Sequence, residues 1–127
     1  EERYPGPDPD ASCYWFEQPG ELKSQTWKKH VVVTEYSLNN LDVADMDRDG
    51  DFDIITCEHK GPKGKQKLQI FENDGKGDFK ERIADKGKES HLGALVTDMD
   101  NDGDPDIVSA AWDYYQYLHL WRNDAVK

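Results

Sequence analysis

Short apolar segments recur along most of the chain, and Leu68, Ile70 and the Phe71-Glu72 edge alternate with the period expected of a β-strand. Such segments fall at residues 13–18, 27–33, 41–44, 54–57, 68–72 and 79–83, and residues 93–122 hold three more. No stretch carries apolar residues at i, i+3, i+4 and i+7 between helix caps, so we expect little or no helix. The pattern predicts an all-β, antiparallel protein.

The chain repeats itself after about 53 residues, the separation of Asp45 and Asp98. LDVADMDRDGDFDIITCE lies over LGALVTDMDNDGDPDIVSAA, and Phe16, Phe71 and Trp121 fall at matching places. Each complete unit holds four strands, the size of one blade of a β-propeller, which needs at least about four blades to close. The chain therefore predicts about two and a half blades.

The blade boundaries follow from this repeat. Residues 1–36 are expected to carry the outer strands of a first blade, residues 37–86 a complete second blade, and residues 87–127 the first three strands of a third. Such a segment cannot close into a ring alone, so we expect further blades from the same parent chain or from other subunits. The alternative is a free-standing antiparallel sandwich in which the repeat is coincidental.

The composition of the chain is unusual mainly in two acidic segments. Leu, Ile, Val and Phe make up 24 of 127 residues and the net charge is -11, a combination typical of disordered chains. However, residues 45–53 and 98–106 hold ten of the 27 acidic residues, with local charges of -4 and -5, so the rest of the chain carries only -2. Four Trp and six Tyr add apolar bulk. We expect a folded chain whose two acidic segments bind a cation.

Several classes of protein are disfavoured. No apolar run approaches the ~20 residues that span a membrane, and the acidic balance argues against binding nucleic acid through its phosphates. Two Cys residues, Cys13 and Cys57, are too few for a disulfide framework and are expected to be buried thiols, although a bridge between adjacent blades stays open. The chain opens with EERYPGPDPD and without Met, so we expect a mature form, a proteolytic product or a cut piece.

The acidic segments DMDRDGDFD and DMDNDGDPD place Asp at positions 1, 3, 5, 7 and 9 and Gly at position 6. Alternate positions of a tight loop can point oxygens at one centre, and calcium takes six to eight oxygen ligands. An EF-hand would need Glu at position 12 and flanking helices, but Thr56 and Ser109 stand there and β-branched segments follow. The remaining alternative is a solvated acidic turn without metal.

The pattern D-x-D-x-D-G-x-x-D, followed by an apolar D-I-[IV] strand and a W/F-E/R-N edge strand, resembles the FG-GAP/VCBS repeats of integrin-α-like calcium-binding β-propellers. A clear FG-GAP tetrapeptide is missing, with residues 92–94 its nearest remnant, which favours the broader VCBS group found mostly in secreted microbial proteins. The resemblance implies two structural calcium ions and a secreted, extracellular protein. It implies side-chain ligation by Asp45, Asp47, Asp49, Asp53, Asp98, Asp100, Asp102 and Asp106, and carbonyl ligation by Asp51 and Asp104.

A ligand is expected on the face opposite the acidic loops, where the loops at residues 35–40, 59–66, 86–91 and 113–116 would converge. Tyr114 and Tyr115 beside Asp113 could stack on a sugar. His59 and His91 lie at or next to this face, where either could act as a general base. Packing between blades is the expected role of three further aromatic residues, Trp15, Trp27 and Trp121.

These observations favour a non-catalytic, calcium-stabilised binding module for carbohydrate or another extracellular partner. No catalytic residue is assigned. The alternative is part of a secreted carbohydrate-active enzyme, since polysaccharide lyases and sugar dehydratases are built on similar blades. A third reading is a purely architectural part of a larger assembly.

Overall fold

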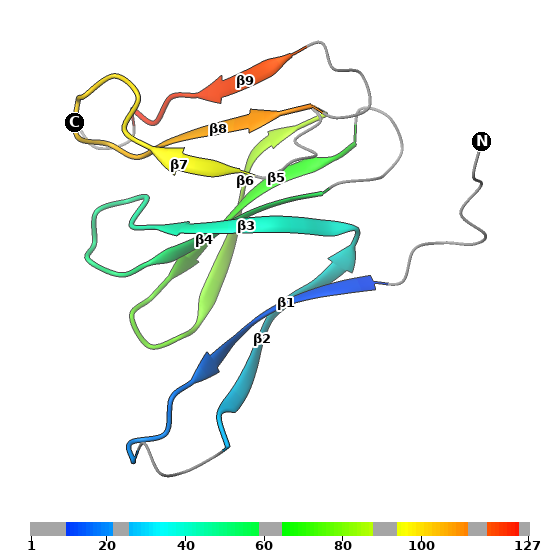
Figure 1. Cartoon of the computed structure of the whole chain (residues 1–127), viewed down its shortest axis with the longest axis vertical. Helices are drawn as coiled ribbons and strands as arrows, with labels where there is room; N and C mark the ends of the chain where they lie inside the picture. Colours follow the sequence, from blue (N-terminus) through cyan, green and yellow to red (C-terminus); the bar gives the residue numbers. More distant parts are fainter. Residues whose placement is uncertain (1–9, 22–25, 59–64, 88–93, 112–116, 125–127) are drawn as a thin grey trace.

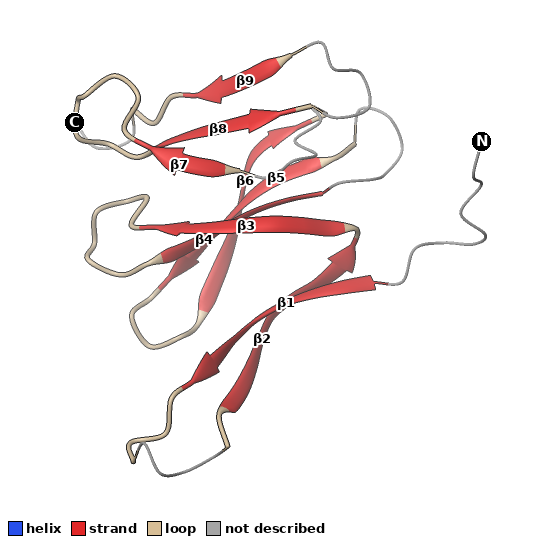
Figure 2. Cartoon of the chain, in the orientation of Figure 1, coloured by secondary structure: helices blue, strands red, loops and turns tan. Residues whose placement is uncertain are grey.

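A computed structural model describes residues 10–21, 26–58, 65–87, 94–111 and 117–124 of the chain. These residues form nine β-strands in three separate antiparallel sheets and no helix (Figures 1 and 2), which confirms the all-β prediction. No sheet closes on itself. Among the described residues no helix is long and apolar enough to cross a membrane.

The sheets contain two, four and three strands in chain order. The first sheet pairs β1 (Asp10–Glu17) with β2 (Lys28–Tyr36). The central sheet runs in the order β3 (Leu38–Ala44), β4 (Asp53–Glu58), β5 (Lys67–Asn73) and β6 (Phe79–Lys86). The third sheet consists of β7 (Leu95–Thr97), β8 (Asp106–Ala110) and β9 (Leu118–Trp121).

The central sheet lies between the other two and buries apolar side chains on both of its faces (Figure 1). Towards the first sheet it presents Ile54 and Phe71, which pack with Cys13. Towards the third sheet it presents Ile55, Cys57 and Leu68, which pack with Met46, Ala94 and Ile107. Because successive residues of a strand point to opposite faces, a strand buried on both sides is apolar without alternation. This explains the continuous run from Ile54 to Cys57.

The chain passes from the first sheet to the central sheet at a single residue, Ser37, so the loop predicted over residues 35–40 was wrong. Ser37 and Asn40 both have positive φ, at 61° and 42°. The first turns the chain sharply, and the second sits in a bulge that lets Asn39 and Leu41 both pair with β4. Asn residues normally indicate turns, but Asn also tolerates the left-handed conformation that this bulge needs.

A partly buried polar network joins the first sheet to the central sheet. Glu35 on β2 accepts hydrogen bonds from the Lys67 ammonium at 2.7 Å and from the Gln69 amide at 2.8 Å. The same amide donates to Glu81 on β6 at 2.7 Å. Burial alone would lower the pKa of Lys67, but the hydrogen bond to Glu35 and the charges of Glu58 and Glu81 raise it above its usual value. Lys67 therefore stays charged and holds the two sheets together.

The three Trp residues expected to pack between sheets differ in outcome. Trp121 packs against the cluster between the central and third sheets, and its indole N–H donates to Asp85 of β6 at 2.5 Å. Trp15 is half-buried and stacks on His30 with ring centroids 4.1 Å apart. Trp27, directly before β2, is 50% exposed, so half of its surface has no packing partner among the described residues.

Gly77 should be the most sensitive glycine of the β5–β6 turn. Its φ is +89°, and a Cβ there would lie 2.6 Å from the Trp15 ring of the first sheet. Gly77→Ala is therefore expected to cost about 2 kcal/mol, from backbone strain and overpacking together. Gly20→Ala is the matched control, because a Cβ at Gly20 meets nothing within 4 Å. Urea unfolding of both variants measures the difference, and equal stabilities would contradict the Trp15 contact.

Candidate metal centre

The two acidic segments form loops at the same end of the molecule (Figure 1). The first loop, residues 45–53, connects β3 to β4, and the second loop, residues 98–106, connects β7 to β8. Each loop begins where one strand ends and ends where a buried strand begins. Because these two strands pair with each other, ladder hydrogen bonds fix both ends of the loop. The sequence therefore places ten Asp residues in two rigidly anchored turns.

The last Asp of each loop is completely buried and anchors the turn. Asp53 accepts hydrogen bonds from the backbone N–H of Met46 at 2.8 Å and of Asn73 at 2.9 Å. Asp106 accepts the equivalent bonds from Met99 and Asn123, both at 2.8 Å. Each carboxylate thus joins the start of its loop to the end of the third strand of the same sheet. These hydrogen bonds order each loop without a bound ion.

The other carboxylates hold the loop backbone in the same way in both copies. The position 1 side chains, Asp45 and Asp98, accept the N–H of Gly50 and Gly103 at 3.0 and 2.9 Å. Positions 3 and 5 each accept the N–H two residues later, at 2.9 to 3.3 Å. The residues at positions 4 and 6 have positive φ in both loops. They are Arg48 and Gly50 in the first loop and Asn101 and Gly103 in the second. These features turn the short Asp side chains inward.

The result is a cluster of oxygens in each loop. In the first loop, Asp45, Asp47 and Asp49 offer oxygens that all lie within 4.8 Å of one another. In the second loop Asp98, Asp100 and Asp106 do so. Two ligands of one calcium ion, each 2.3 to 2.6 Å from it, lie at most about 5 Å apart. Both clusters therefore have dimensions that a divalent cation can bridge.

One oxygen in the first loop has no partner of its own. Asp45 Oδ1 is buried and accepts no hydrogen bond within the described structure, while the other oxygen of the same carboxylate accepts Gly50 N–H. A buried carboxylate oxygen without a donor is costly. A divalent cation is one partner that could satisfy this atom, and the clustered side chains around it offer oxygens, which a hard cation prefers.

The remaining predicted ligands lie in different surroundings. Asp53 sits beside the first cluster with both oxygens occupied by backbone N–H groups, and Asp102 accepts Asp104 N–H at the edge of the second. Asp51, a predicted carbonyl donor, has its side chain against Gly75. Asp104, the other one, is 1% exposed and forms an ion pair with Arg48 of the first loop.

Burial and neighbouring negative charges raise the pKa values of two carboxylates in the loops. Burial raises the pKa of Asp53, and the charges of Asp47 and Asp49 act in the same direction, against the backbone hydrogen bonds. Loss of solvent and the neighbouring charge of Asp102 raise the pKa of Asp100. Burial is the largest cause of both shifts, and the neighbouring carboxylates add to it.

Sequence reasoning missed the residues that support the loops from other strands. Asn73 and Asn123 follow the third strand of their sheets and orient Asp53 and Asp106. Their signal is the recurrence of Asn-Asp in FEND and WRND at matching places of the repeat. The Arg48 contact with the second loop has no such signal, because the second copy has Asn101 at that position.

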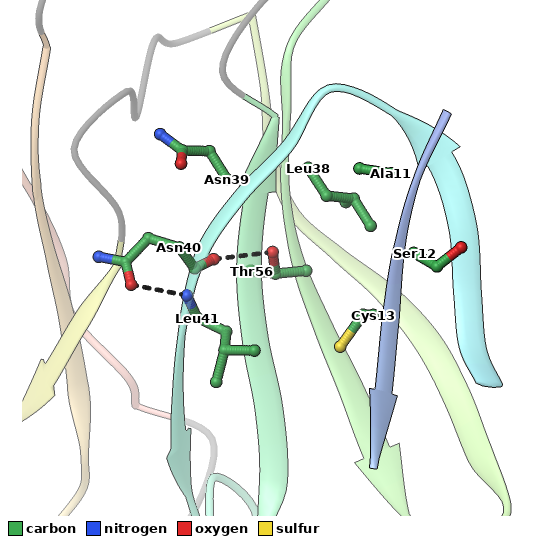
Figure 3. Close-up of a pocket in the computed structure, with 8 residues that line it drawn as sticks. All are labelled: Ala11, Ser12, Cys13, Leu38, Asn39, Asn40, Leu41 and Thr56. Carbon is green, nitrogen blue, oxygen red and sulfur yellow. Dashed lines mark hydrogen bonds between the residues drawn. The ribbon is translucent and has the colours of Figure 1, made fainter. Parts of the chain in front are cut away.

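The five residues predicted to bind an organic ligand, His59, His91, Asp113, Tyr114 and Tyr115, all lie outside the described residues. Within the described residues a cavity of about 280 Å³ opens between β1 and β3 (Figure 3). Thr56 donates to the Asn40 carbonyl across its wall at 3.0 Å, and the buried Cys13 thiol, whose pKa burial raises, borders it. None of the described residues that line the cavity has a charged side chain, so these residues suit an uncharged polar group.

No disulfide links the two Cys residues. Cys13 and Cys57 are both buried, in the clusters on opposite faces of the central sheet. The prediction of buried thiols is confirmed, and the bridge between adjacent sheets does not form.

Comparison with known proteins gave no match to the chain among protein-family models, curated proteins or solved structures.

Proposed function

We propose that the chain is a calcium-stabilised segment of a β-propeller of the VCBS/FG-GAP type, in an extracellular protein, and that it serves as a binding module for carbohydrate or another extracellular partner. The observation that carries the proposal is the recurrence of one loop geometry. Both acidic loops share the same anchoring carboxylate, the same turn hydrogen bonds and the same two positions of positive φ. A solvated acidic turn has no need of such agreement.

The way the sheets stack supports the propeller. Ile54 and Phe71 are register partners that face the first sheet. Ile107 and Trp121 are the equivalent partners in the third sheet, and they face the central sheet. Each sheet thus packs on its predecessor through the same pair of positions. A repeated contact of this kind generates a series of blades around an axis.

The outer faces of the stack support the expectation of further blades. Leu95, Leu118 and Leu120 are exposed on the third sheet, and Leu118 shows 74% of its surface. At the other end Tyr14, Phe16 and Val31 are exposed on the first sheet. Contiguous apolar surface of this kind normally marks an interface. Blades of the parent chain or of other subunits would cover both faces.

The proposed ion is calcium, and its role is structural. The clustered ligand atoms are carboxylate oxygens without His or Cys, which suits calcium better than zinc or copper. Calcium sites of extracellular modules have Kd values of about 10⁻⁴ to 10⁻³ M, which matches a millimolar calcium environment outside cells. This is the basis for the proposed extracellular location.

The binding role is tested by a glycan array with the chain in millimolar calcium. We expect binding that falls at least tenfold in the Tyr114→Ala, Tyr115→Ala double variant, because stacking on an aromatic ring supplies much of the affinity for a sugar. Tyr117→Ala is the matched control, since Tyr117 is an exposed aromatic residue of the same segment. Equal binding by the double variant would mean that Tyr114 and Tyr115 do not bind the sugar. Formation of an unsaturated, ultraviolet-absorbing product from a polysaccharide would contradict a non-catalytic role.

A further inference from the structure

The two acidic loops are in direct contact through Arg48. Its guanidinium, at position 4 of the first loop, forms an ion pair with the Asp104 carboxylate, at position 7 of the second loop. Asp104 is 1% exposed, so its charge is removed from water and depends on this partner. A Cβ at the neighbouring Gly103 would lie 3.0 Å from the same guanidinium. The Arg48 side chain is therefore fitted closely to the backbone of the second loop.

A second link runs in parallel to the ion pair. The Asn123 side-chain amide donates to the Met46 carbonyl of the first loop at 2.9 Å. The backbone N–H of the same residue donates to Asp106, the anchor of the second loop, at 2.8 Å. One residue at the end of β9 thus contacts both loops. The loops form a continuous hydrogen-bonded unit across the interface between the central and third sheets.

The position of Arg48 connects its conformation to the filling of the first loop. Its neighbours on both sides, Asp47 and Asp49, belong to the oxygen cluster of that loop. Arg48 itself has φ 63°, a conformation that is unfavourable for Arg and that the surrounding turn must hold. An ion bound by both neighbours would fix the backbone on either side of Arg48 and so direct its side chain to Asp104.

We propose that Arg48 couples the two cation sites, so that calcium in the first loop raises the calcium affinity of the second. The inference rests on the proposed function, since it requires that both loops bind calcium. When the first loop is filled, the entropy of ordering Arg48 and Asp104 is already lost, and the second ion binds to a loop that needs less ordering. Direct repulsion between two divalent cations acts in the opposite direction, so coupling without Arg48 should vanish or change sign.

A thermodynamic cycle measured by calorimetric calcium titration tests the coupling. Asp47→Asn, Asp49→Asn removes the first site, and the Kd of the second loop is then measured with Arg48 and with Arg48→Asn. We expect removal of the first site to weaken the second about fivefold or more with Arg48 present, and less than twofold in the Asn background. Asn is the matched replacement because it tolerates positive φ and already stands at Asn101 of the second loop, where φ is 60°.

Two further variants separate the ion pair from other effects. Asp104→Asn breaks the same pair from the second loop and should remove the same coupling. Arg82→Asn removes an Arg that pairs with Glu72 on β5, and it should leave the coupling unchanged. Circular dichroism melting in chelator confirms that each variant is folded before titration.

The outcomes distinguish the coupling from the function beneath it. Two calcium sites whose affinities are independent would overturn the coupling and leave the proposed function intact. An equal loss of affinity on removal of the first site, with and without Arg48, would do the same. A chain that binds no calcium in either loop would overturn both.

Discussion

Chelation of calcium is expected to lower the melting temperature of the chain by about 16 to 27 °C, compared with calcium at a hundred times its Kd. At that saturation each site adds about 2.7 kcal/mol to the free energy of unfolding. A domain of this size shifts its melting temperature by roughly 3 to 5 °C per kcal/mol, so two filled sites give a shift of this size. The ion stabilises by neutralising the carboxylates that surround the unpartnered oxygen of Asp45.

Differential scanning calorimetry in calcium, in EDTA and in magnesium measures this shift. Magnesium is the specificity control, since it demands a tighter octahedral geometry and keeps its waters. Removal of one cluster by Asp98→Asn, Asp100→Asn should leave about half of the calcium-dependent shift. Identical melting curves in calcium and EDTA would contradict calcium stabilisation.

Replacement of either anchoring carboxylate should destabilise the chain even without calcium. Asp53→Ala and Asp106→Ala are each expected to lower the free energy of unfolding by about 2 to 4 kcal/mol, because each leaves two backbone N–H groups without their charged acceptor. The groups concerned are those of Met46 and Asn73 in one loop and those of Met99 and Asn123 in the other.

Urea unfolding in EDTA measures this cost apart from calcium binding. Asp78→Ala is the matched control, since Asp78 is an exposed carboxylate on the β5–β6 turn of the same end of the molecule. An anchor variant as stable as the control would mean that the loop ends are not held by these carboxylates.

Much of the strand pattern was predictable from the sequence, because strand-like segments occur in one unit and recur in the next after about 53 residues. A strand such as β4 buries a side chain on every residue from Ile54 to Cys57, so its apolar run had to be internal to a stack of sheets. The acidic loops were predictable for a similar reason. Position 6 needs a residue that tolerates positive φ, and Gly stands there in both copies.

The details that were wrong or missed depend on contacts between distant parts of the chain. Ser37 turns the chain in one residue, with a φ that propensity alone would assign to Gly or Asn. Trp27 is 50% exposed within the described residues, although large aromatic side chains are usually well buried. Arg48 reads as a solvated charge in a loop, and only the stacking of the third sheet on the central one brings Asp104 to it.

The two proposed cation sites can be examined in one experiment, a crystal structure of the chain grown in calcium. We expect two ions, one bound by Asp45, Asp47 and Asp49 and the other by Asp98, Asp100 and Asp106, with each loop lying between two strands. Water alone in both loops, or a helix on either side of them, would contradict the calcium-stabilised propeller.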